Sequence, residues 1–187
     1  VILWIHVDDI LAHGPTLDKL SEGLRIRLDT TVELGLICQP CKTVSPTQTI
    51  KFCGFIYDTQ TIPTIIIPDN KVSRAIAMID YVGQGCSHVL ARLVVSMVVG
   101  FLQSLVPATP GNIGASFLRP LYEDLHRLQD NDTPGTKQFY FCTMTLHQQS
   151  KDCLWWWRKA LISGLSRYNH PRDVATIGVL WGDGSGT

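Results

Sequence analysis

The sequence predicts an α+β fold in which strands and one helix come first and helices dominate the later part. Apolar residues alternate with polar ones near residue 50, a period of two that is typical of β-strands. Leucines recur at steps of three and four in residues 17–28, and other apolar residues do so after residue 69, which is typical of amphipathic helices. The 187 residues are 45% hydrophobic and 17% charged, a composition that indicates a folded globular chain.

The first element is the stretch ILWIHVDDILAHG, residues 2–14, where apolar runs flank Asp8 and Asp9. It predicts two antiparallel strands joined by a tight turn that contains both aspartates. Asp-Asp is a poor pair for such a turn, because two-residue hairpin turns favour Asn-Gly or Asp-Gly. Burying an unpaired charge is also costly. The stretch therefore indicates a functional site.

A helix is expected next, with Leu17, Leu20, Leu24 and Leu28 along one side. Thr16 is the expected N-cap and Gly35 the expected stop of this helix. We expect the helix to pack on the sheet.

The stretch TIKFCGFIYDTQTIPTIIIP, from residue 49, predicts one strand, a turn at residues 58–61 and a β-branched return strand. A continuous strand would place Ile50, Phe52, Gly54 and Ile56 on one face. A glycine inside a strand indicates a bulge or a close backbone approach.

The chain after residue 68 predicts mainly helices. The first begins at Asp69, with Val72, Ile76, Ile79 and Val82 on its buried side. Further helices are expected in PLYEDLHRLQ, from residue 120, and in SKDCLWWWRKALISGL, from residue 150, before a last strand within residues 174–187. The tryptophans in the second of these are either core residues or nucleic-acid stacking groups.

Residues 89–106, VLARLVVSMVVGFLQSLV, are nearly long enough to cross a bilayer. Arg92, Ser96, Gly100 and Gln103 recur at steps of four, four and three, which collects polar and small residues in one stripe of a helix. The segment therefore predicts an amphipathic core helix, and no membrane partner is expected.

Charge and cysteine content set further limits. Lys plus Arg and Asp plus Glu are equal at 16 each, so net charge gives no argument for a nucleic-acid partner. Residues 70–119 hold four bases against one acid, which suits phosphate contact or a solvated face. Six cysteines without a regular framework indicate reduced thiols and an intracellular protein, and CQPC at residues 38–41 is a weak zinc candidate.

Several of these motifs occur together in one enzyme family. The HVDD hairpin, the helix after it, Lys42 in CKT, the FCGF segment and IPTIIIPDNKVSRAI resemble, in order and spacing, the C-terminal half of a retroelement reverse transcriptase, with retrotransposon enzymes the most similar. The later GFLQSLVPATP and DCLWWWRKAL stretches resemble the thumb and connection of that family, and LWGDGSG resembles the first strand of its ribonuclease H domain.

The resemblance implies an architecture. Residues 1–68 would form a partial palm of β-hairpins plus a helix, with a metal-binding hairpin and a primer-grip-like hairpin. Residues 69–130 would be thumb-like helices, 131–173 a connection-like helical segment, and 174–187 the start of a ribonuclease H-like domain.

It also implies site residues. Asp8 and Asp9 would be catalytic metal ligands for Mg²⁺ or Mn²⁺, and Lys42 would lie near the triphosphate. Two-metal nucleotidyl transfer needs converging carboxylate oxygens, which explains the paired aspartates. His6 stands where the family usually has an aromatic residue. The implied substrate-binding residues are His6, Val7, Phe52, Gly54 and Phe55, and Asp183 is a ribonuclease H candidate.

The implied function is RNA-directed DNA synthesis, with an RNA template, a DNA primer, deoxynucleoside triphosphates and the remainder of the polymerase polyprotein as partners. In that family a further palm aspartate and the fingers would precede Val1, so we expect this chain alone to be inactive. The alternative is a non-catalytic relic or interaction domain that retains the palm scaffold.

Overall fold

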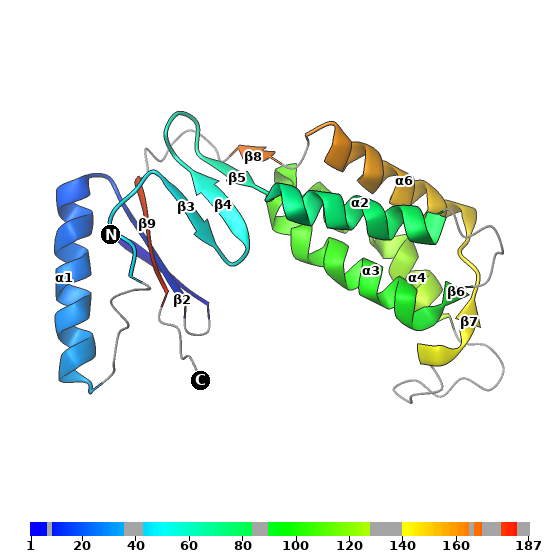
Figure 1. Cartoon of the computed structure of the whole chain (residues 1–187), viewed down its shortest axis with the longest axis horizontal. Helices are drawn as coiled ribbons and strands as arrows, with labels where there is room; N and C mark the ends of the chain where they lie inside the picture. Colours follow the sequence, from blue (N-terminus) through cyan, green and yellow to red (C-terminus); the bar gives the residue numbers. More distant parts are fainter. Residues whose placement is uncertain are drawn as a thin grey trace. The chain divides into compact units, whose positions relative to one another are not determined.

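The computed structural model describes residues 1–6, 9–35, 43–83, 90–127, 140–164, 167–169 and 177–182. The predicted mixed α+β class is confirmed, with strands concentrated before residue 67 and helices after it. The chain divides into two compact units (Figure 1). Unit 1 comprises Val1–Ile66 and Asn169–Thr187, and unit 2 comprises Ile67–Tyr168.

The first sheet of unit 1 has β2 (Asp9–Gly14) at its centre, between β1 (Ile2–His6) and β9 (Ile177–Gly182). Both pairings are antiparallel. Ile10, Leu11 and Ala12 are all buried, although consecutive strand residues point to opposite faces. The central strand is therefore covered on both faces, which explains its unbroken apolar run.

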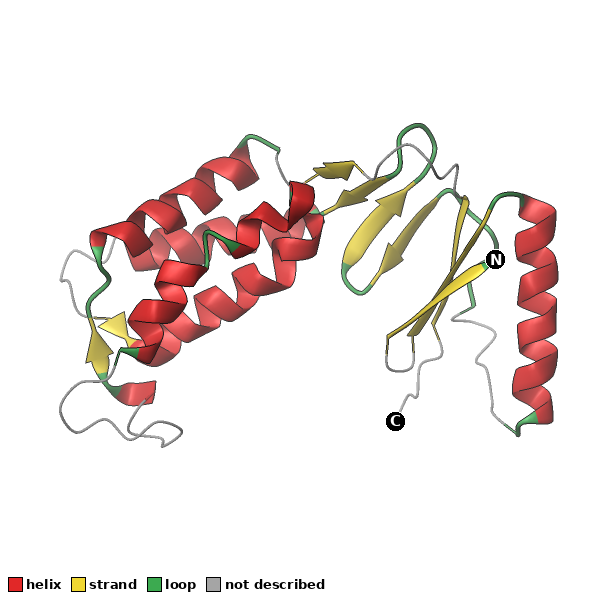
Figure 2. Ribbon diagram, turned by 180° about the vertical axis from the view of Figure 1, so that it is seen from behind, coloured by secondary structure: helices red, strands yellow, loops and turns green. Residues whose placement is uncertain are grey.

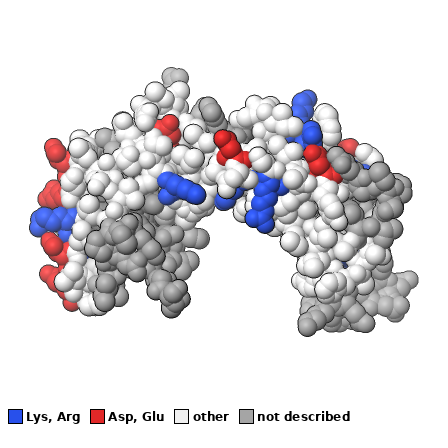
Figure 3. All heavy atoms as spheres, viewed as in Figure 1, with Lys and Arg blue, Asp and Glu red and all other residues white. Residues whose placement is uncertain are grey.

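One face of this sheet is covered by α1 (Leu17–Glu33), whose predicted helix is confirmed. The Thr16 hydroxyl accepts a hydrogen bond from the Lys19 backbone N–H at 3.3 Å, as expected of an N-cap. Gly35 follows the helix with φ of 73°, a conformation that glycine adopts without strain. Leu20 packs on Ala12 of β2. The exposed face of α1 carries both acidic and basic side chains (Figure 3).

The other face of β2 meets a second group of strands, β3 (Thr49–Phe52), β4 (Phe55–Asp58) and β5 (Thr64–Ile66). The prediction of one continuous strand through residues 50–57 was wrong. β3 and β4 are an antiparallel hairpin, with Phe52 paired to Phe55 across a two-residue turn. Cys53 and Gly54 have φ of 46° and 78°, so Gly54 belongs to a tight turn and not to a bulge.

That turn changes which residues share a face. Ile50 and Phe52 lie on the same side as Phe55 and Tyr57, because the two residues between the strands shift the alternation by one. Ile50 and Phe52 form a buried cluster with Leu11 of β2, and Tyr57 packs against it. This cluster joins the two groups of strands.

Unit 2 is built from packed helices, shown in red in Figure 2. They are α2 (Asp69–Gly83), α3 (Arg92–Leu105), α4 (Arg119–His126) and α6 (Gln148–Ile162). Short 3-10 turns at Val106–Ala108 and Pro110–Ala115 connect α3 to the segment before α4. The strands β6 (Leu90–Ala91) and β7 (Thr143–Met144) form a two-residue antiparallel pair. β8 (Arg167–Asn169) crosses the boundary between the units.

The three tryptophans of α6 have different surroundings. Trp157 is buried in the core, Trp156 stacks on Phe117 with ring centres 3.8 Å apart, and Trp155 is exposed. The α6 helix is also tied to α2 by an ion pair, in which Arg158 Nε lies 2.6 Å from Asp80 Oδ1. That hydrogen bond raises the pKa of Arg158 above its usual value.

The helix predicted within residues 89–106 is α3, and among the described residues no helix combines the length and apolarity needed to cross a bilayer. One part of its predicted polar stripe was wrong. Gly100 and Gln103 are exposed, but Arg92 is only 1% exposed. Its guanidinium donates a 3.0 Å hydrogen bond to the Arg127 carbonyl, and such a partner makes burial tolerable. Arg92 is therefore not part of a solvated basic surface.

Candidate functional site

The predicted aspartate hairpin is formed by β1 and β2. The last pair before the turn is His6 with Asp9, which leaves Val7 and Asp8 as the two connecting residues. Both lie outside the described residues. Asp9 is the first residue of β2 and therefore directly follows the turn. The prediction had placed it inside the turn. The antiparallel pairing itself is as predicted.

The residues of β2 that follow the turn are buried and hold the hairpin in position. Leu11, two residues after Asp9, belongs to the cluster with Ile50 and Phe52, and Ala12 contacts Leu20 of α1. A strand with both faces buried has little freedom to slip, because a one-residue slip would exchange its two faces. The strand that carries Asp9 is thereby held in one register.

The candidates Phe52, Gly54 and Phe55 lie together in the β3–β4 hairpin. Phe52 and Phe55 are both buried, and Phe52 meets Tyr57 edge-on with ring centres 6.1 Å apart. Burial and the neighbouring Cys53 thiol raise the pKa of Tyr57, so its hydroxyl is neutral. The aromatic rings of this hairpin support the fold, and the exposed part is the turn at Cys53.

The remaining predicted site residues lie in other segments of the chain. Lys42 and Asp183 lie outside the described residues, as do Cys38 and Cys41. Gly182, which directly precedes Asp183 in the chain, is paired with Asp9. Within the described ranges, no three His, Cys, Asp or Glu side chains gather as metal ligands would.

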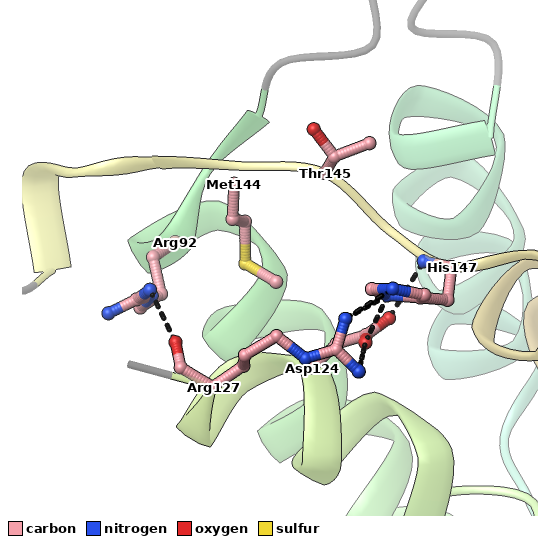
Figure 4. A pocket seen from close by; sticks show the side chains of 6 residues that line it. All are labelled: Arg92, Asp124, Arg127, Met144, Thr145 and His147. Carbon is pink, nitrogen blue, oxygen red and sulfur yellow. Dashed lines mark hydrogen bonds and ion pairs between the residues drawn. The ribbon is translucent and has the colours of Figure 1, made fainter. Parts of the chain in front are cut away.

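Unit 2 contains a polar cluster that the sequence analysis did not identify (Figure 4). At its centre is Asp124 of α4, whose side chain is only 3% exposed. One carboxylate oxygen accepts hydrogen bonds from the His147 backbone N–H at 2.9 Å and the Ser150 hydroxyl at 2.6 Å. The other lies 2.7 Å from His147 Nδ1 and 3.5 Å from an Arg127 nitrogen.

Asp124 acts as a cap for α6 from another helix. His147 is the N-cap residue of α6 and makes no capping bond with its own side chain, so the carboxylate of Asp124 satisfies its backbone N–H. A negative charge here is also favoured by the helix dipole. Burial raises the pKa of Asp124, but the hydrogen bonds from Ser150 and His147 outweigh that effect and hold it below its usual value.

The serine, histidine and aspartate of this cluster are not a hydrolytic triad. Ser150 is buried and donates its proton to Asp124. His147 contacts Arg127 through both ring nitrogens, so no ring nitrogen accepts from the serine. A triad needs the histidine between the nucleophile and the carboxylate. The arrangement therefore stabilises structure and does not activate a nucleophile.

Next to this cluster is a pocket of about 220 Å³. Arg92, Asp124 and Met144 are its buried residues, and Arg127, Thr145 and His147 are its exposed ones. The sequence contains a signal for Asp124, since it shares helical spacing with the buried Leu121 and Leu125.

No protein-family model, no protein with a curated description and no solved structure matches this chain.

Proposed function

We propose that this chain is part of an RNA-directed DNA polymerase and that the β1–β2 hairpin carries its metal-binding aspartates. The observation that supports this proposal is the register of the hairpin, in which His6 pairs with Asp9 and only Val7 and Asp8 connect the strands. Two consecutive aspartates where β2 begins, next to its buried residues, would join carboxylate donors to a rigid base.

The donor chemistry fits Mg²⁺ or Mn²⁺, because carboxylate oxygens are the ligands these ions prefer. Asp8 and Asp9 would hold the ions, which when bound supply charge neutralisation at the reacting phosphate. Asp8 is the principal ligand in this proposal and Asp9 the supporting one. The β3–β4 hairpin would contact the primer end through its exposed turn, since Phe52 and Phe55 are used in the core.

The palm and thumb assignments belong to the same proposal. Residues 1–68, most of which belong to unit 1, would supply the second half of a palm, and the helices within residues 69–130 of unit 2 would supply the thumb. The arrangement of strands before residue 67 and helices after it agrees with that order. The remaining partners would be the RNA template, the DNA primer and deoxynucleoside triphosphates.

The test is primer extension on an RNA template by the longer polymerase of which this chain would be a part. Asp8→Asn keeps the side-chain shape but removes the charge that holds a divalent ion. Loss of several kcal/mol of transition-state stabilisation predicts a rate reduction of about 100-fold or more. Asp9→Asn should cost less, because water replaces a supporting ligand on Mg²⁺.

Asp18→Asn is the matched control, since Asp18 is an exposed acid in the first turn of α1, close in sequence but outside the hairpin. Circular dichroism of each variant checks folding. A folded Asp8→Asn protein that extends primers at the wild-type rate would rule out the metal-ligand role. The chain would then be better described as a non-catalytic scaffold that retains the hairpin.

A further inference from the structure

The pocket in unit 2 has a chemistry that the polymerase proposal does not use. It lies where the end of α4, the strand β7 and the start of α6 meet, and it is lined by two arginines, one histidine, one threonine, one methionine and the buried Asp124 (Figure 4). We propose that this pocket binds a phosphate group.

Two arginines line the pocket, and they differ in how deeply they are buried. Arg92 is buried, and one of its terminal nitrogens donates to the Arg127 carbonyl at 3.0 Å. Arg127 has a side chain that is 52% exposed, and its guanidinium also contacts Asp124 and His147. Guanidinium groups present several N–H donors in a fixed plane, which suits the oxygens of phosphate. A ligand would meet one arginine at the entrance and another below it.

The carboxylate in the pocket does not prevent anion binding. Asp124 already accepts from the His147 backbone N–H and the Ser150 hydroxyl through one oxygen. Its other oxygen contacts His147 Nδ1 and Arg127. Asp124 is thus already paired with Arg127, and Arg92 adds a second positive charge to the lining, so the two guanidinium charges together exceed the single negative charge of the carboxylate.

Size and shape favour phosphate over a carboxylate. A pocket needs only about 10–15 Å³ of such volume to hold one water, so about 220 Å³ has room for one phosphate group with surrounding waters. Phosphate oxygens point in tetrahedral directions, so one group would meet Arg127 and Arg92 together. The two oxygens of a carboxylate lie in one plane and reach fewer walls.

The experiment is calorimetric titration of the 187-residue chain at pH 7, without divalent ions and in a buffer free of phosphate. Three probes distinguish which kind of molecule carries the bound phosphate. They are inorganic phosphate, a nucleoside 5′-monophosphate, and a single-stranded oligonucleotide without terminal phosphates. We expect saturable binding at one site per chain. Binding of the first two probes identifies a phosphomonoester ligand, and binding of the oligonucleotide alone identifies a nucleic-acid backbone.

The variants are Arg127→Gln and, as a control, Arg119→Gln, which removes an exposed arginine of α4 outside the pocket. Loss of a charge-assisted hydrogen bond predicts about tenfold or greater weakening for Arg127→Gln. Arg119→Gln should bind as the wild type does. If Arg127→Gln is unfolded by circular dichroism, amide shifts of Thr145 and His147 in the wild type during phosphate titration provide the same test.

The proposal is overturned if the wild-type chain binds none of the three probes saturably, or if both arginine variants bind equally well. Unshifted amides at Thr145 and His147 during saturation would place the ligand elsewhere and overturn it too. Because the titration contains no divalent ion and the pocket lies in unit 2, its failure would leave the hairpin proposal for Asp8 and Asp9 unaffected.

Discussion

Gly114 lies directly against the indole ring of Trp157. A Cβ atom at Gly114 would be 2.6 and 2.7 Å from the Cζ2 and Cη2 atoms of Trp157, and 3.1 Å from the Thr109 methyl. Trp157 is one of the largest fully buried side chains in the described part of the chain, so its ring cannot move outward without disturbing the core of unit 2.

Gly114→Ala should therefore destabilise the protein by about 1–3 kcal/mol through overpacking. Gly100→Ala is the control, because Gly100 is an exposed residue inside α3 with open space around it. Alanine there should stabilise the helix by about 0.5–1 kcal/mol. Urea unfolding followed by circular dichroism measures both. Adding Trp157→Phe to Gly114→Ala should recover part of the loss, and an additive double variant would argue against a direct clash.

Asp124→Asn should destabilise the protein by about 1–3 kcal/mol, because an amide nitrogen would face donors that now meet a carboxylate oxygen. Glu123→Gln is the comparison, since Glu123 forms an exposed pair with Arg119 and should matter little. Thermal unfolding of the two variants measures the difference. Equal melting temperatures would show that the capping contacts of Asp124 contribute nothing measurable.

The effect of Asp124 should also depend on pH. Its pKa in the folded chain lies below the usual value of about 3.9, so the folded state favours the carboxylate. The stabilisation is complete above about pH 4 and is lost as the pH falls through the lower, folded pKa. The difference in the free energy of unfolding between wild type and Asp124→Asn should therefore become smaller at acid pH. A difference that stays constant from pH 7 to pH 2 would contradict this linkage.

Cys53→Asn should stabilise the β3–β4 hairpin. Cys53 has φ of 46°, and asparagine tolerates the left-handed region better than cysteine does. The expected gain is about 0.5–1 kcal/mol. Gly54→Ala should destabilise the hairpin by about 1–2 kcal/mol, because Gly54 has φ of 78° and a residue with a Cβ atom is strained there. Denaturant midpoints report both, and a Gly54→Ala midpoint at or above wild type would exclude this turn geometry.

Local signals were sufficient for most helices and for the first hairpin. The α1 helix has leucines at helical spacing, a cap at Thr16 and a stop at Gly35, all within 20 residues of sequence. In the β3–β4 hairpin the buried positions change from even to odd numbers between Phe52 and Phe55, but in the sequence the apolar Ile56 continues the even series and hides that change. A two-residue turn causes that change, and a bulge was the wrong interpretation of Gly54.

Contacts between distant residues were not predictable. The buried state of Arg92 depends on a carbonyl at Arg127, and the role of Asp124 depends on backbone and hydroxyl donors of α6. A helical pattern relates residues that are three or four positions apart, and these partners are much further away in the sequence. A single sequence shows that a charge lies beside apolar residues, but the acceptor or donor that makes its burial tolerable is set by the packing of α3, α4 and α6.

The pairing of β2 with β9 has a consequence for the order in which the chain folds. Unit 2 is continuous in sequence, so it can fold as soon as residues 67–168 are available. The strand β2 pairs with β9, so one of its edges has no hydrogen-bonding partner until Ile177–Gly182 has been synthesised. Until then β2 presents an apolar, unpaired edge, the kind of surface on which strands of other chains add. During synthesis, unit 1 is thus the later and more aggregation-prone of the two units.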